Sequence, residues 1–158
     1  MKLKPLHDRF IEGLKCHLPG WKFVASNRHF RLSRPGLNLY MHVAFINHDC
    51  DFDVTVDVAV EFVQDKRRIG IVGAELGNIE GVGQVRHSVA CEADADAASR
   101  SVYEHFRSVG LPFLEVHSNR TYVLEVLRQG GTKARLISPI EQYRPTLIAA
   151  LEEAENAA

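Results

Sequence analysis

The strongest constraint on this fold is a regular alternation of apolar and polar side chains over residues 21–74. A repeat of two residues is typical of β-strands that bury one face. Short runs of turn-forming residues divide the stretch, at Asn27-Arg28, Pro35-Gly36, 48–51 and Asp65-Lys66. We therefore predict an antiparallel meander with strands at residues 21–26, 29–34, 37–47, 52–63 and 68–74.

These turns predict a register, which can be tested by asking whether like side chains face each other. Five apolar pairs share one face: Phe30–Met41, Leu32–Leu39, Val43–Val56, Phe45–Val54 and Phe62–Ile69. The other face is polar and carries His29, Arg31, Ser33, Asn38, Tyr40, His42, Asp53, Thr55, Asp57 and Glu61. We expect helices to cover the apolar face alone, and Val56 at mid-strand to be fully buried.

Helical periodicity precedes the sheet. Residues 5–18 are predicted to form a helix that ends at Pro19-Gly20, because their apolar residues recur every three or four positions. The stripe consists of Leu6, Phe10, Ile11, Leu14 and Leu18.

After the sheet, glycine-bearing residues 75–83 are predicted to form a loop and residues 84–90 a further strand. A second helix is expected to begin at Asp94 or Asp96. Gly110 is predicted to end it in a left-handed turn, and residues 111–114 to form an apolar linker.

The C-terminal third is predicted to be helical. Asn119 caps a helix over residues 120–129, and residues 138–141 (Ser-Pro-Ile-Glu) match a capping box before a last helix. Pro145 should kink or restart that helix, and the tail from about residue 152 should fray. The order of elements predicts a single α+β domain over residues 1–158. Its antiparallel sheet has about five to six strands, with the N-terminal and C-terminal helices packed on one face.

Composition narrows the function classes. With 19 Lys and Arg against 20 Asp and Glu, the net charge of −1 argues against a nucleic-acid binder, although basic residues cluster near residues 28–34 and 66–68. No apolar run approaches the ~18 residues of a membrane span, and the N-terminus lacks a signal-peptide core. The three cysteines are far apart and include no Cys-x-x-Cys pair, which fits a reducing compartment. We expect a soluble cytoplasmic protein.

Several short segments resemble a bacterial family of small α+β domains of unknown function. These are Gly20-Trp21 at the entry to the sheet, His29-Phe30-Arg31, residues 70–74 (Gly-Ile-Val-Gly-Ala) and residues 110–115 (Gly-Leu-Pro-Phe-Leu-Glu). The resemblance implies a fold and carries no established activity. Some small α+β proteins of this kind act as antitoxin-like immunity or regulatory partners, so the resemblance implies a protein-binding role by analogy.

Three other kinds of site are disfavoured by residue spacing. The glycines of residues 70–83 match neither a P-loop nor a dinucleotide fingerprint, and we interpret them as turn and bulge glycines. Cys50 lies between Asp49 and Asp51, whose charge would raise a thiol pKa and disfavour a nucleophilic thiolate. The same turn lacks the spacing of a calcium loop.

The leading hypothesis is a non-enzymatic binding protein that uses the polar sheet face or its edge. Arg31 and Tyr40 oppose each other in the predicted register, and these residue types are enriched among interface anchors. The hypothesis requires no cofactor. It leaves open whether the partner is a different protein or a second copy of the chain.

The alternative hypothesis is a small metal-dependent enzyme on the same face. The register sets His29 opposite His42 and His42 opposite Asp57, on three adjacent strands that lie ~4.8 Å apart. Two imidazoles and a carboxylate in one row could coordinate Zn²⁺ or Fe²⁺ and leave positions open for water.

Overall fold

The alternating stretch forms the sheet in a computed structural model that describes residues 3–156, with only the backbone described at residues 71 and 72. One helix precedes the sheet, α1 (Lys4–His17). The strands are β1 (Lys22–Val24), β2 (His29–Arg34), β3 (Leu37–Asn47), β4 (Phe52–Gln64), β5 (Arg67–Glu75) and β6 (His87–Val89). The later helices are α2 (Leu76–Glu80), α3 (Glu92–His105), α4 (Leu111–His117), α5 (Arg120–Gln129), α6 (Gly131–Ile137) and α7 (Arg144–Asn156).

The predicted α+β class and antiparallel sheet are confirmed. Strands pair in the order β1-β2-β3-β4-β5. The strand β6 pairs with residues 52–54 at the start of β4, beyond the end of β5. All five predicted apolar pairs are observed: Phe30–Met41, Leu32–Leu39, Val43–Val56, Phe45–Val54 and Phe62–Ile69. The register shifts between Val58 and Val60, where a Cβ on Gly73 would lie 1.5 Å from the Val58 carbonyl oxygen. Glycine is therefore required at this irregularity.

The predicted two-residue turn at Asn27-Arg28 is wrong. Val24 pairs with His29, so four residues connect β1 and β2, and residues 25–27 form a 3₁₀ turn. Arg28 closes this turn in the left-handed region with φ of 48°, and its N–H donates to the Ala25 carbonyl oxygen. Glycine and asparagine are the usual residues in this conformation, so the sequence indicated a turn at Asn27-Arg28 but not that Arg28 itself would be left-handed.

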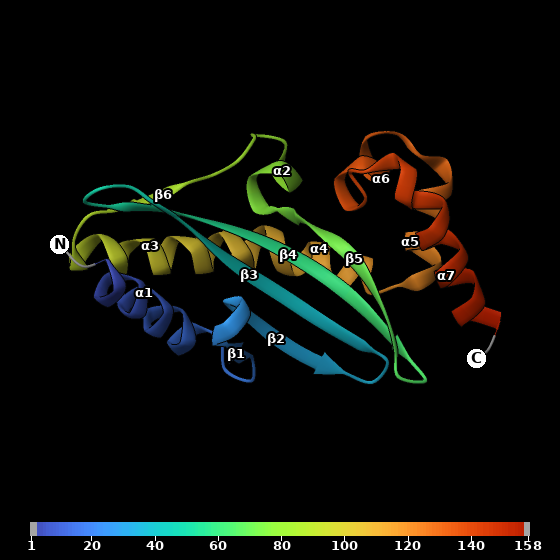
Figure 1. Cartoon of the computed structure of the whole chain (residues 1–158), viewed down its shortest axis with the longest axis horizontal. Coiled ribbons are helices and arrows are strands. Elements are labelled where there is room, and N and C mark those ends of the chain that lie inside the picture. The colour runs from blue at the N-terminus through green and yellow to red at the C-terminus, as the bar shows by residue number, and fades with distance from the viewer. Residues whose placement is uncertain (1–2, 157–158) are drawn as a thin grey trace.

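The helices cover the apolar face, as predicted. Figure 1 shows α3 and α4 running behind the long strands, α1 beside α3, and α5 to α7 gathered beyond β5. The helix α1 closely approaches α3, because a Cβ on Gly13 would lie 2.5 Å from the Ser99 Oγ. At the surface, Arg9 of α1 forms ion pairs with Glu92 and Asp96 of α3.

The predicted helix end at Gly110 and the linker at residues 111–114 are wrong. The chain stays helical through one π turn (Phe106–Gly110) and continues as α4. The Leu111 N–H donates to the Phe106 carbonyl, and this wider turn accommodates Pro112, which would otherwise clash with the helix backbone. Gly110 has a right-handed φ of −68° and is needed for space, since a Cβ there would lie 2.7 Å from the Phe106 ring.

Three further expectations need correction, and one agrees with the structure. Within predicted loop 75–83, residues 76–80 form α2, whose N-terminus is capped by Glu75. The capping box at 138–141 is not formed, because Ser138 instead ends α6, a helix the sequence did not indicate. Pro145 lies in the first turn of α7, which agrees with a restart. The tail does not fray over 152–156, since α7 extends to Asn156 and buries Ala154; residues 157–158 of the predicted tail lie outside the described residues.

Burial of the apolar face predicts the effect of a charge at its centre. Val56 has 3% of its surface exposed, and we expect Val56→Asp to unfold the protein. An unpaired buried carboxylate costs several kcal/mol, against a total stability of about 5–15 kcal/mol. Circular dichroism melting measures the loss.

The matched control is Val63→Asp, which makes the same change on the same strand but on the polar face, opposite Arg68. Its stability should stay within about 1 kcal/mol of the parent protein. A cooperative, unshifted melting curve for Val56→Asp would contradict the orientation of the sheet.

Candidate functional site

The polar face of β2, β3 and β4 contains the residues that the sequence singled out. The predicted register is confirmed here: Arg31 opposes Tyr40, His29 opposes His42, and His42 opposes Asp57. Arg31, Tyr40, His29 and His42 are half-buried. They project from the side of the sheet that faces away from the helices, since each alternates with a residue of the apolar core.

Glu61 is the centre of a hydrogen-bond network on this face. Its Oε1 accepts from the Tyr40 hydroxyl at 2.9 Å and from the Asn38 Nδ2 at 2.8 Å, and the Arg68 Nε lies 3.2 Å away. Burial raises the pKa of Tyr40, and the bond to Glu61 raises it further, so the hydroxyl remains a donor at neutral pH. The network holds the Tyr40 ring in one position.

The other carboxylates of the face are also engaged. Asp57 accepts from the His42 Nδ1 at 2.9 Å, and Asp53 accepts from the Ser88 Oγ at 2.6 Å. The bond from Ser88 is the main reason that the pKa of Asp53 is lowered. Arg31 differs from these groups, because within residues 3–156 it has no carboxylate partner. The Arg31 guanidinium is therefore a positive charge on this face that no carboxylate among the described residues pairs with.

The row of His29, His42 and Asp57 is formed, with one direct bond in it, from His42 to Asp57. The His29 ring packs edge-on against Tyr40, with ring centroids 5.0 Å apart. Burial lowers the pKa of His29, and the nearby charges of Arg31 and His42 lower it further. Among the described residues, no group of three or more His, Cys, Asp or Glu side chains has the arrangement of a metal site.

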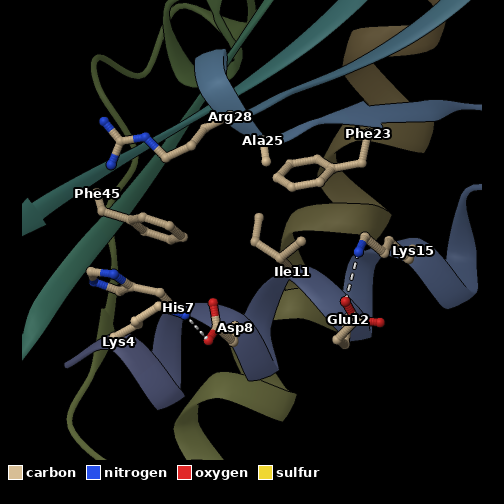
Figure 2. Close-up of a pocket in the computed structure, with 10 residues that line it drawn as sticks. All are labelled: Lys4, His7, Asp8, Ile11, Glu12, Lys15, Phe23, Ala25, Arg28 and Phe45. Carbon is tan, nitrogen blue, oxygen red and sulfur yellow. Dashed lines mark hydrogen bonds and ion pairs between the residues drawn. The ribbon is translucent and has the colours of Figure 1, made fainter. Parts of the chain in front are cut away.

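A second feature, which the sequence reasoning missed, is a cleft of about 380 Å³ between α1 and the loop that connects β1 to β2. Figure 2 shows Ile11, Phe23, Ala25 and Phe45 around its interior, with charged side chains at its rim. The Lys4 and Asp8 side chains pair at the rim, as do Lys15 and Glu12. The cleft is thus apolar inside and charged outside.

His7 forms one end of this cleft. Its ring stacks on Phe45 with centroids 4.2 Å apart and packs edge-on against Phe52 at 4.4 Å. Its Nε2 lies 3.0 Å from the Asn47 Oδ1, so Nε2–H donates to Asn47. Burial lowers the pKa of His7 below its ordinary value of 6.5, so the imidazole is neutral at pH 7. The sequence places Phe45 on the apolar face and His7 beside the apolar stripe of its helix, but it does not indicate that the two meet.

Comparisons with family models, with curated proteins and with solved structures find no match. Within residues 3–156, no helix has both the length and the apolar character needed to cross a bilayer.

The proximity of Arg31 to His29 predicts a measurable change in titration. The pKa of His29 should lie below 6.5 in the parent protein, and Arg31→Ala should raise it, because protonation is easier once a neighbouring positive charge is removed. The imidazole proton resonances, followed by NMR against pH, report this pKa.

Arg107→Ala is the control, since Arg107 is an exposed arginine that pairs with Glu104 on the helical side. It should leave the titration of His29 unchanged. If Arg31→Ala also left it unchanged, the Arg31 guanidinium would not act on the histidine row.

Proposed function

We propose that this protein is a non-enzymatic binding module whose polar sheet face, centred on Arg31 and Tyr40, binds another protein. The observation that carries the proposal is the contrast between Arg31 and the acids around it. Glu61, Asp57 and Asp53 each have a partner on the face, whereas Arg31 has none among residues 3–156. A guanidinium without a partner is available for a carboxylate of another molecule.

The form of the face favours a protein over a small molecule. Its side chains stand on three paired strands, and the hydrogen bonds of Glu61 hold Tyr40 in place before binding. Pre-ordered arginine and tyrosine side chains lose little conformational entropy on association and are enriched among interface anchors. The partner should place an Asp or Glu on Arg31 and an apolar group on the Tyr40 ring. An antitoxin or immunity protein would be one module of this kind.

The double variant Arg31→Ala, Tyr40→Ala tests the proposal. It should abolish recovery of the partner in a pull-down and change thermal stability by no more than about 1 kcal/mol, because both residues lie outside the core. The captured partner is then purified and titrated by calorimetry against the parent protein, which gives the stoichiometry expected of a binding module. Analytical ultracentrifugation identifies the case in which the partner is a second copy of this chain.

A double variant with the same residue types elsewhere, Arg107→Ala with Tyr143→Ala, serves as the control and should keep the partner. Tyr143 is 60% exposed on the helical side. Equal recovery by the Arg31, Tyr40 variant would remove this face from consideration.

A metal-dependent enzyme is the second candidate, and one observation favours it. The His42 Nδ1 bonds Asp57, and histidine ligands of metals commonly donate one ring N–H to a carboxylate while the other nitrogen binds the ion. In this alternative, His29 and His42 supply nitrogen ligands, and Asp57 orients His42 and offers its second oxygen. Zn²⁺ or Fe²⁺ would accept these groups.

Elemental analysis separates the two candidates. Under the metal hypothesis, protein purified without an affinity tag from a metal-supplemented culture holds a stoichiometric ion, and His42→Ala loses that ion and any activity together. The control is His105→Ala, which removes a histidine that pairs with Glu80 away from this face. A metal-free parent protein would leave the binding module as the proposed function.

A further inference from the structure

The cleft between α1 and the β1–β2 loop has the size and character of a small-molecule site. Its volume of about 380 Å³ is within the range of ligand pockets, which are ~300–1,000 Å³ and mostly apolar with a few polar groups. Two aromatic rings, Phe23 and Phe45, border the interior, and Ile11 and Ala25 line it between them (Figure 2). An apolar group would contact aromatic and aliphatic carbon here.

The rim has one unbalanced charge. Asp8 is paired with Lys4 and Glu12 with Lys15, each at 2.6 Å, so these four charges cancel locally. The fifth charged residue, Arg28, has no carboxylate partner in the described part of the chain. Its guanidinium carbon lies 5.6 Å from the centre of the Phe45 ring, at the edge of the apolar interior. The cleft therefore has a net positive charge at a defined place.

The backbone at Arg28 determines where its side chain begins. Its φ of 48° is in the left-handed region, where a residue with a Cβ is strained and glycine is not. The conformation is fixed by two backbone bonds, from the Arg28 N–H to Ala25 and from the Val43 N–H to the Arg28 carbonyl. These bonds fix the position from which the Arg28 side chain extends towards the Phe45 ring.

We propose that this cleft binds a small organic anion, with a flat apolar body between Phe23 and Phe45 and a carboxylate or similar group on Arg28. The neutral His7, stacked on Phe45 and bonded to Asn47, fixes one wall of the site. Since Phe45 lies on the helix-covered side of the sheet, the cleft is separate from the polar face. The two proposals can therefore fail independently.

The probes are 2-naphthoate, which has the required body and charge, and 2-naphthylmethylammonium, which has the same rings and the opposite charge. Binding is followed by NMR of ¹⁵N-labelled protein. Millimolar affinity is expected for ligands of this size. For 2-naphthoate, the amide signals that shift should be those of Ile11, Ala25, Phe45 and their neighbours, and the ammonium probe should bind more weakly.

Arg28→Gly removes the charge and relieves the backbone strain, so the variant should fold at least as well as the parent. It should weaken 2-naphthoate binding about tenfold or more, because a hydrogen bond to a charged group is lost. Lys66→Gly is the matched control: Lys66 is also an exposed cation at positive φ (68°), in the β4–β5 turn away from the cleft. This control should bind 2-naphthoate as the parent does.

A third variant, Ala25→Phe, fills the cleft without changing its charge and should weaken both probes. The proposal is overturned if 2-naphthoate causes no shifts, if its shifts fall on the polar face, or if both probes bind equally. It is also overturned if Arg28→Gly binds 2-naphthoate as tightly as Lys66→Gly does.

Discussion

The pairing of β3 with β4 is the interaction on which the rest of the molecule depends. Each strand buries every second residue, so a slip of β3 by one position would turn Val43 outward and His42 into the core. Burying one such valine, leucine or phenylalanine side chain contributes about 1.5–3 kcal/mol, and a slip would lose that contribution along the whole strand pair. The short connections at Pro35-Gly36 and at residues 48–51 allow no other register. The core and the polar face are therefore specified together.

This coupling explains which parts of the fold were predictable. The sheet register follows from local alternation and turn chemistry, and it was correct from β2 to β5. The errors occur where tertiary packing outweighs a local signal. Gly110 and Pro112 are ordinary end-of-helix residues, yet burial of Phe106 and Leu114 on either side keeps the chain helical through a π turn. The predicted length of the β1–β2 turn was wrong for a similar reason. Backbone bonds of Arg28 to Ala25 and Val43 impose its left-handed conformation.

The two candidate sites differ in predictability for the same reason. Arg31, Tyr40, His29, His42 and Asp57 are cross-strand neighbours, so a correct register was sufficient to bring them together. Their bonding was not predictable, because the network around Glu61 depends on side-chain rotamers and on Arg68 from β5. The cleft depends on how α1 docks against β3, a contact between residues 7 and 45–47 that no periodicity in the chain encodes.

The close approach of α1 to α3 has a consequence for the cleft on the other side of α1. Gly13 leaves no room for a methyl group beside Ser99, whose hydroxyl is itself bonded to the Asp96 carbonyl. The same helix carries Ile11 and His7 into the cleft. The helix α1 thus lies between α3 on one side and the cleft on the other. A change in its distance from α3 would also change the width of the cleft. A larger side chain at residue 13 would push α1 away from α3 and towards the cleft, so the small size of Gly13 helps to keep the cleft open.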